Sequence, residues 1–338
     1  MTFILPTGPR LLIEADLRPM QGTRFQPTGF PALGAATYQL HDGTRMLLVE
    51  SHQSMANRLE ATVLEPGTVT PRGFLSGMPY VLVQREGTPL TSSLVEAHRL
   101  NSPYILEGAD RTLRDALIMQ LDVKSEGAVD ERLLAQVLAR YDLGSLIHGV
   151  FLAKKEIAGG RFRLRRALSA FVEARDVETV SSGGVKNDHV NPSGETSSGF
   201  GNVPFSREEF TAASITAFFN LDLAQLRAYR LPEPLTELLI VMSMWKIRRL
   251  LDDGLRLRTA CDFDVASIRA VRPDGYELPS ATLLESRLTA LLGMPEMAGN
   301  FATPVVTIVE WTDGGSAKKP KKGKGKPDVM SDEELGDD

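Results

Sequence analysis

Hydrophobic and polar residues recur along the chain with two different periods, and the period predicts each element. Apolar residues return at helical spacing at about 110–122 and 130–141, while 235–251 is apolar on most sides. Both patterns are typical of helices that pack in a core. We also expect helices over 51–60 and at about 280–292. Short runs that indicate strands lie at 11–15, 45–49, 80–84, 145–152, 161–177, 263–271 and 304–311.

Long loops interrupt this alternation of strands and helices. Residues 19–34 and 181–204 are dominated by Gly, Pro, Ser and Asn, which predicts irregular backbone. Loops of this length inside a compact domain usually have a function. The pattern therefore predicts an α+β core with large insertions, forming a single domain over residues 1–312.

The last 26 residues, 313–338, differ from the rest in composition. They hold six lysines followed by a mainly acidic end, with seven acids in all, and almost no large apolar side chain. Such a segment cannot bury enough apolar surface to offset the entropy of ordering it. We expect a disordered tail, which is Lys-rich first and acidic afterwards.

Composition excludes several classes of protein. The lone cysteine, Cys261, excludes a disulfide framework and a cysteine-based zinc site. The apolar runs are too short to cross a bilayer and the start lacks a secretory pattern, so we expect no membrane association and a cytoplasmic location. The net charge of −5 argues against indiscriminate coating of nucleic acid. It still permits a narrow basic groove.

The helix expected over 51–60 has two contrasting faces. Met55, Ala56 and Leu59 share one face, and Gln53 and Asn57 lie on the other. Arg58 lies at the edge, and Ser51 can cap the N-terminus. A capped helix end offers backbone N–H groups to an anion. Amides with one arginine suit binding a phosphodiester better than cleaving one. The alternative is an ordinary amphipathic surface helix.

Two basic clusters interrupt the acidic chain. Residues 154–166 hold six basic side chains against the single acid Glu156, and Arg161, Arg163 and Arg165 alternate with apolar residues. Alternation puts these three arginines on one face of a strand, where they can follow a phosphate backbone. The second cluster comprises Lys246, Arg248, Arg249, Arg256 and Arg258. A solvated surface is the alternative for both clusters.

No catalytic, cofactor or metal motif accompanies these clusters. The chain has no P-loop, no Gly-x-Gly-x-x-Gly after a strand, no His-x-x-x-His pair and no Gly-x-Ser-x-Gly elbow. Asp188 and His189 are neighbours in the sequence and are a candidate acid–base pair. They lie in a Gly-rich loop, which is a poor support for a catalytic base. We expect no catalytic residue, no metal and no cofactor.

Six motifs in a fixed order make the sequence more specific. They are Arg24–Pro31, Glu50–Glu60, His98–Tyr104, His148–Leu152, Gly183–His189 and Gly254–Cys261. Together they resemble the backbone subunit of type I-G (formerly I-U) CRISPR surveillance complexes, of the RAMP superfamily of CRISPR RNA-binding proteins. The resemblance runs from about residue 10 to residue 312, so the tail lies outside it.

This resemblance implies a modified RNA-recognition-motif (ferredoxin-like) palm with inserted fingers and a thumb, which we place at about 178–205. It implies a non-catalytic subunit that polymerises along a guide RNA (crRNA) in a Cascade complex for antiviral defence. The thumb of each copy would kink the guide and flip out a base. The implied partners are the guide, the target DNA strand paired with it, further copies of the chain, and the large subunit and guide-end-binding or processing subunit.

The resemblance and the residue chemistry together give a set of expected RNA contacts. They are Arg24, Gln26, Ser51, His52, Gln53, Asn57, Arg58, His98, Arg99, Lys154, Arg161, Arg163, Arg165, Lys186, Asn187, His189, Asn202, Arg256 and Arg258. A guide must be held whatever its sequence, so contacts to phosphate and sugar are expected. Because no aromatic RNA-recognition signature occurs, we also expect the sheet to lack a base-stacking aromatic pair.

Two other functions stay open. The first is a metal-dependent or His-dependent ribonuclease of the same superfamily, which would use His52, His98 or His189 to process or cleave RNA. No complete catalytic set at a workable spacing accompanies these histidines. The second is a general RNA chaperone, which would protect bound RNA without any periodicity.

Overall fold

A curled antiparallel sheet forms the centre of the molecule in the computed structural model, which describes residues 4–30, 33–121, 128–157 and 159–312. Its strand order is β14-β15-β1-β13-β10-β5-β4, and each neighbouring pair is antiparallel. The strands are β14 (Leu255–Arg258), β15 (Cys261–Arg272), β1 (Arg10–Pro19), β13 (Ser214–Asp222), β10 (Leu168–Arg175), β5 (Arg45–Glu50) and β4 (Thr37–Gln39).

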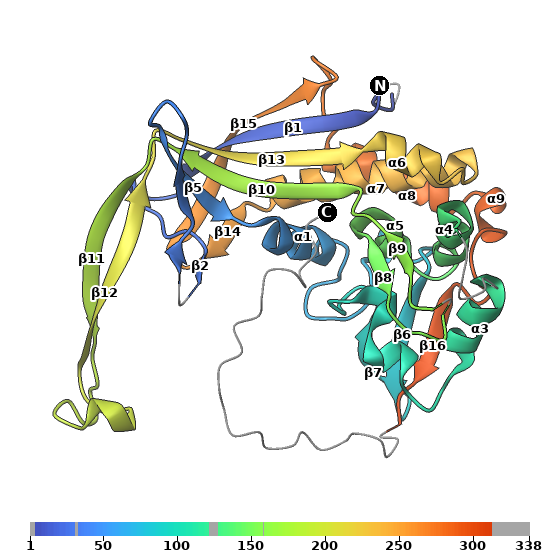
Figure 1. The fold of residues 1–338 in the computed structure, drawn as a ribbon, viewed down its shortest axis with the longest axis horizontal. Coiled ribbons are helices and arrows are strands. Elements are labelled where there is room, and N and C mark those ends of the chain that lie inside the picture. The colour runs from blue at the N-terminus through green and yellow to red at the C-terminus, as the bar shows by residue number, and fades with distance from the viewer. Residues whose placement is uncertain (1–3, 31–32, 122–127, 158, 313–338) are drawn as a thin grey trace.

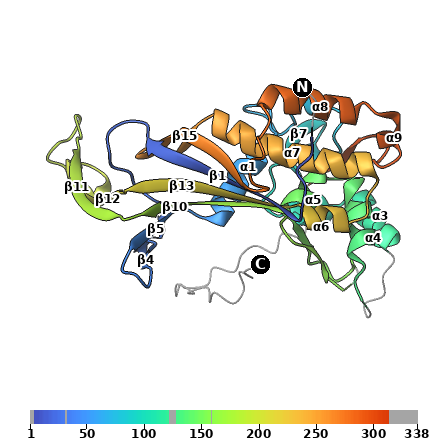
Figure 2. The same ribbon diagram turned by 90° about the horizontal axis from the view of Figure 1, so that it is seen from above.

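The helices of the described residues cover one face of this sheet and leave the other face open (Figures 1 and 2). Along β1, Leu11, Ile13, Ala15 and Leu17 are buried and the residues between them are partly exposed, which is the alternation of a one-sided sheet. The helices near this face are α1 (His52–Ala61), α6 (Leu223–Ala228), α7 (Glu233–Asp252) and α8 (Ala281–Leu292). Trp245 of α7 is fully buried, and its indole N–H donates to Glu285 of α8 at 3.0 Å.

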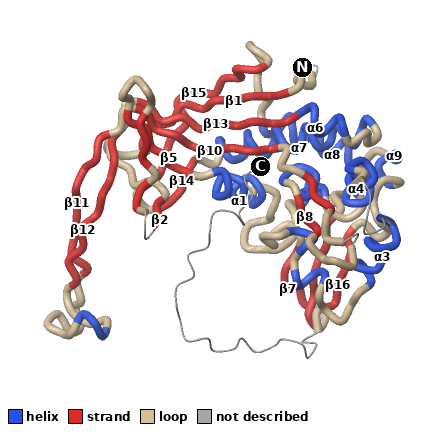
Figure 3. Tube along the Cα trace, in the orientation of Figure 1, coloured by secondary structure: helices blue, strands red, loops and turns tan. Residues whose placement is uncertain are grey.

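A second lobe follows α1 in the chain and lies at one end of the sheet (Figure 3). In it, β6 pairs in parallel with β16 and antiparallel with β7, and β8 and β9 form a short ribbon. Its elements are β6 (Tyr80–Arg85), β7 (Thr88–Ser92), α2 (Pro103–Leu106), α3 (Thr112–Leu121), α4 (Glu131–Ala139), α5 (Leu143–His148), β8 (Val150–Leu152), β9 (Phe162–Leu164), α9 (Pro295–Ala298) and β16 (Val306–Glu310).

A long two-stranded hairpin projects from the opposite end of the sheet (Figure 1). Its strands are β11 (Glu178–Lys186) and β12 (Val203–Thr211), paired antiparallel from Glu178 with Thr211 to Lys186 with Val203. A small pair, β2 (Gly29–Phe30) and β3 (Gly34–Ala35), lies in the loop after β1. The helix α1 therefore lies between two projecting parts, the hairpin and the second lobe.

Most elements expected from periodicity are present, one expectation was wrong and another was wrong in part. Residues 143–148 form the helix α5 and not a strand, because Asp142 caps it by accepting from the Gly144 and Ser145 N–H groups. An apolar run this short has no diagnostic period. Within 181–204, only residues 181–186 and 203–204 pair as a hairpin, since backbone pairing needs no apolar side chains, and the residues between them form the expected loop. The expected tail, 313–338, lies outside the described residues.

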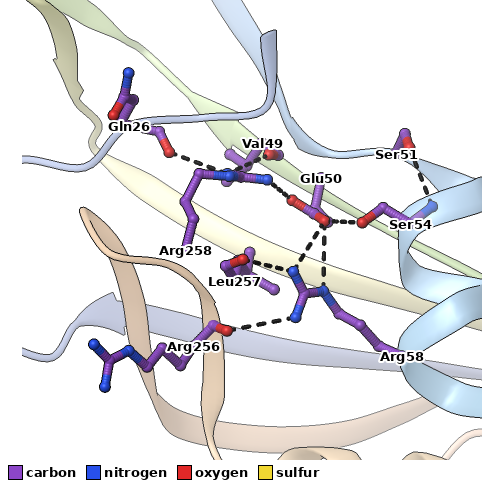
Figure 4. A network of polar contacts seen from close by, with 9 residues as sticks. All are labelled: Gln26, Val49, Glu50, Ser51, Ser54, Arg58, Arg256, Leu257 and Arg258. Carbon is purple, nitrogen blue, oxygen red and sulfur yellow. Dashed lines mark hydrogen bonds and ion pairs between the residues drawn. The ribbon is translucent and has the colours of Figure 1, made fainter. Parts of the chain in front are cut away.

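The buried carboxylate of Glu50 fixes where α1 lies on the sheet (Figure 4). Glu50 ends β5 and is 1% exposed. Its Oε1 accepts from the Ser54 hydroxyl and lies 3.4 Å from Nη2 of Arg58, both on α1. Its Oε2 pairs with Arg258 of β14. One carboxylate thus holds a strand end, a helix and the far strand of the same sheet.

The two guanidinium groups extend this network to the backbone. Arg58 Nη2 donates to the Leu257 carbonyl at 2.6 Å, and Arg258 Nη1 donates to the Gln26 carbonyl at 3.0 Å. A buried charge is tolerated when it is paired and its remaining hydrogen-bonding positions are satisfied. Together the three side chains, called the Glu50 network below, also anchor the loop that contains Gln26.

We expect Glu50→Gln to lower the free energy of unfolding by about 3 kcal/mol, because it leaves two partly buried guanidinium groups without their carboxylate. Urea denaturation measures this loss. The matched control is Glu178→Gln, which breaks an ion pair with Arg45 at a residue whose side chain is 75% exposed. That control should cost less than about 1 kcal/mol. Equal losses in the two variants would contradict the role given to Glu50.

A buried lysine joins α7 to α1. Lys246 is 2% exposed, and its ammonium group donates to the Leu59 carbonyl at 3.3 Å. Burial lowers the pKa of Lys246 to about 8. The sequence grouped Lys246 with a surface cluster, and this was wrong, because the side chain faces inward. In the same cluster, Arg248 and Arg249 pair with Asp252 and Asp253 on the helix surface.

Lys246 makes the free energy of unfolding depend on pH in the alkaline range. The unfolded chain keeps this proton up to about pH 10.5, whereas the folded chain releases it near pH 8. The folded protein should therefore become more stable as the pH rises between these values. In Lys246→Met this pH dependence should vanish, and the free energy of unfolding at pH 7.5 should equal or exceed that of the parent. Denaturation curves at several pH values test this. If the free energy of unfolding of the variant still rises with pH as steeply as that of the parent, the burial argument is contradicted.

Candidate nucleic-acid interface

The exposed face of α1 carries amide side chains next to an arginine. Ser51 caps the helix, and its hydroxyl accepts from the Ser54 N–H at 3.3 Å. On the exposed face, Gln53 Nε2 donates to Asn57 Oδ1 at 3.0 Å, and Arg166 Nη2 donates to Gln53 Oε1 at 2.9 Å. The capped N-terminus, the two amides and this guanidinium form one polar surface. Met55, Ala56 and Leu59 are buried as expected.

Arg166 was counted in the basic cluster 154–166 but was not among the expected RNA contacts. The alternation of 161–165 drew attention to every second residue, and Arg166 falls outside that period. It lies just after β9, where the chain turns towards β10, so its side chain reaches Gln53 of α1. The unbroken pair Arg165–Arg166 at the end of the basic run was the available signal.

The arginine row lies on the β8–β9 ribbon, adjoining α1. Arg161, Arg163 and Arg165 are exposed, and Phe162 and Leu164 between them are buried, as the alternation predicted. The row belongs to a separate two-stranded ribbon and not to the central sheet. Lys154, in the turn after β8, pairs with Glu107. Through Arg166, the surface of α1 continues onto this ribbon.

Four arginines among the expected RNA contacts form ion pairs that hold parts of the protein together. Arg58 and Arg258 belong to the Glu50 network, with side chains 29% and 27% exposed. Arg99 is largely buried, pairs with Glu60 and donates to the Gly149 carbonyl at 2.8 Å. Arg24 lies 3.2 Å from Glu209 at the base of the hairpin. These contacts give all four a structural role, and their contact with RNA stays a prediction.

The expected thumb contacts lie at the end of the hairpin, far from α1 in both views (Figures 1 and 2). Lys186, Asn187, His189 and Asn202 are exposed there. Asp188 organises the turn by accepting from the backbone N–H groups of Val190, Asn191 and Gly201, each at 2.9 Å. These bonds lower the pKa of Asp188. Its contacts are those of a turn-forming carboxylate.

The remaining expected contacts lie in three other places. Gln26 lines a hollow between the loop after β1 and the base of the hairpin, with a volume of about 700 Å³. Arg256 is exposed on β14, and its carbonyl accepts from Arg58 at 3.4 Å. His98 is exposed just before Arg99. The structure thus gathers Ser51, His52, Gln53 and Asn57 beside the arginine row and separates them from the thumb contacts.

The uncovered face of the sheet carries a pair of aromatic rings, and the expectation that the sheet has no base-stacking pair stays a prediction. Phe171 of β10 and Phe218 of β13 are register partners, and their ring centroids are 5.0 Å apart. The ring of His52 stacks on Phe171 at 4.6 Å. Pairing of strands distant in sequence creates this pair, so a search for a contiguous motif misses it. The rings cover one another's faces, which differs from a flat platform for bases.

Within residues 4–30, 33–121, 128–157 and 159–312, no group of three or more His, Cys, Asp or Glu side chains is placed to hold a metal ion. The same residues contain no helix long and apolar enough to span a membrane.

Comparison with solved structures finds distant likeness. A chain of a "CRISPR RNA-guided surveillance complex, pre-nicking" is 12% identical, with 84% of this chain and 87% of that chain covered and a TM-score of 0.40. Csc2 of Thermofilum pendens is also 12% identical, with 86% of this chain and 74% of that chain covered and a TM-score of 0.30. No curated protein matches the sequence.

Comparison with protein families is more specific. Residues 11–179 match the family described as "CRISPR-associated protein GSU0053". The match begins at β1 and ends at the start of the hairpin, so it includes the Glu50 network's strand β5, the helix α1 and the arginine row. It spans half of the chain, and the protein therefore belongs to this CRISPR-associated family.

Proposed function

We propose that this protein is a non-catalytic backbone subunit that binds the guide RNA of a type I-G CRISPR surveillance complex. One observation carries the proposal: the capped end of α1, the amides Gln53 and Asn57, and the arginines of 163–166 form one continuous surface in a chain of a CRISPR-associated family. These groups donate hydrogen bonds to phosphate, and guanidinium groups also supply positive charge.

The chemistry of this surface fits a ligand of arbitrary sequence. Contacts to phosphate and sugar position a strand without reading it, and the base edges stay available for pairing with a target. Amide and guanidinium groups bind phosphate without having to transfer a proton. The proposal therefore places the target DNA strand on the guide by base pairing, and it assigns no cleavage step to this chain.

The order of the elements supports a ferredoxin-like palm. Counting β1, α1, β10, β13, α7 and β15 along the chain gives a β-α-β-β-α-β unit, in which the four strands lie in the order β15-β1-β13-β10. Both helices lie on the same face, as the bond from Lys246 to Leu59 requires. This is the arrangement of the ferredoxin-like motif. In this proposal the hairpin β11–β12 is the thumb, and residues 1–312 are one domain.

The charges on the uncovered face of the sheet support placing RNA elsewhere. There, Arg269 pairs with Glu14 and Asp16, and Arg18 pairs with Asp264. Paired charges attract phosphate weakly, because each guanidinium already has a carboxylate partner. Much of the chain's excess of acids can therefore lie away from the RNA. The net charge of −5 is compatible with a local basic surface.

The projecting hairpin suits contacts between successive copies. A filament needs heterologous contacts, in which one surface of a subunit binds a different surface of the next. A long arm at one end of the sheet can reach a neighbour along the guide, and the large subunit and the guide-end-binding or processing subunit would complete the assembly.

We expect the triple variant Gln53→Ala, Asn57→Ala, Arg166→Ala to weaken guide binding roughly tenfold or more, because it removes charge-assisted contacts to phosphate. The loss should be similar for guides of unrelated sequence. Arg58 is left intact, since its removal would disturb the Glu50 network. Filter binding with two guides measures the effect, and Arg269→Ala on the opposite face is the control. Unchanged affinity, or a loss for one guide sequence only, would count against this surface.

A second variant tests the thumb. Residues 187–202 are replaced by Asn-Gly, a turn that can join Lys186 directly to its register partner Val203. We expect a folded protein that still binds the guide but no longer protects it from nuclease at regular intervals. His189→Ala, which keeps the whole hairpin, is the control and should preserve the periodicity. Persistent periodicity in the shortened protein would place the thumb elsewhere, and RNA cleavage abolished by His189→Ala would favour the ribonuclease alternative.

A further inference from the structure

An exposed phenylalanine lies within the arginine row. Phe151 of β8 is 51% exposed, whereas Val150 and Leu152 beside it are buried. Its register partner is Arg163 on β9. Side chains of register partners lie on the same face of a ribbon, so Phe151 shares its face with Arg163. Phe151 was not among the RNA contacts expected from the sequence, all of which are polar or charged residues.

Two arginines of the row, Arg163 and Arg165, are exposed on the same side of the molecule as Phe151. In the described part of the chain, no carboxylate forms an ion pair with Arg163 or Arg165. Other exposed arginines differ in this respect, since Arg18 pairs with Asp264 and Arg45 with Glu178. The guanidinium groups of Arg163 and Arg165, together with an exposed ring, leave both an anionic group and a flat apolar group to be supplied by a ligand.

We infer that Phe151, with Arg163 and Arg165, forms a base-stacking site for a single-stranded polynucleotide. Proteins that bind single strands without regard to sequence combine a basic track with aromatic side chains on which bases stack. The arginines would hold consecutive phosphates while an unpaired base rests on the Phe151 ring. The complementarity is both electrostatic and apolar, and an acidic protein segment would satisfy only the arginines.

The position of the ribbon connects this site with the surface on α1. Arg166, which follows the row, bonds to Gln53 of α1 at 2.9 Å. A strand that leaves the α1 surface can therefore continue past Arg166 onto the ribbon. The inference rests on the proposed function, because it extends the same strand path. It adds a stacked base where the proposed function has phosphate contacts alone.

The test uses the full chain with Phe151→Ala, Phe151→Trp and a control, Ile308→Ala, which removes an apolar side chain that is 49% exposed on β16. One arm measures affinity for a labelled single-stranded guide, and the other measures affinity of the guide-loaded protein for complementary single-stranded DNA. In at least one arm, Phe151→Ala should weaken binding roughly five- to hundredfold, as loss of one stacked base does. Phe151→Trp should retain affinity, and the control should leave it unchanged.

Salt dependence separates stacking from charge. Phe151→Ala should leave the slope of log affinity against log salt unchanged, and Arg163→Ala should reduce it by about 0.7, as loss of one phosphate contact on a single strand does. A loss in the guide arm assigns the stacked base to the guide, and a loss in the DNA arm alone assigns it to the target strand.

One result would overturn the inference. The inference fails if Phe151→Ala binds both the guide and the complementary DNA with the affinity of the parent. It fails in the same way if the variant loses only binding to another protein. If the α1 triple variant still weakens guide binding, the proposed function survives this failure. If the triple variant also binds like the parent, the proposed function fails with it.

Discussion

The carboxylate of Glu50 is the interaction on which the candidate interface depends. It is buried at the end of β5, one residue before the cap of α1, and it pairs with arginines from α1 and from β14. A buried charge left without partners is costly, so this geometry strongly favours one arrangement of strand, helix and sheet. The orientation of α1 follows from it. The apolar face of the helix then packs inward, and Gln53 and Asn57 face outward beside Arg166.

The arginines of this chain divide into two groups with different tasks. Arg58, Arg99 and Arg258 hold elements together through carboxylates and backbone carbonyls. Arg163 and Arg165 have no carboxylate partner within the described residues and lie exposed on a ribbon. This division shows how an acidic chain can present a basic surface, since several of its other exposed arginines, such as Arg18, Arg45 and Arg269, are paired with carboxylates. It also identifies arginines whose replacement should affect binding while sparing the fold.

The sequence predicted the elements that carry a clear period and an end signal. The helix after Ser51 was predicted with its cap and its buried face, because both depend on residues within one turn of each other. The alternation of Arg161, Arg163 and Arg165 predicted their common face for the same reason. Three features depend on residues far apart in the chain and could not be read locally: the pairing of Glu50 with Arg258, the stacking of Phe171 on Phe218, and the position of Phe151 opposite Arg163. The hairpin was missed because its strands pair through the backbone, with little apolar content to mark them.

The central claim is that this chain holds guide RNA of any sequence along one continuous surface. The most direct measurement is to purify the protein from cells that express it with its partner subunits and a guide array, and to size and sequence the RNA bound to it. The account predicts RNAs of uniform guide length, with every spacer of the array represented. Heterogeneous cellular RNA, a preference for one spacer sequence, or no RNA at all would contradict it.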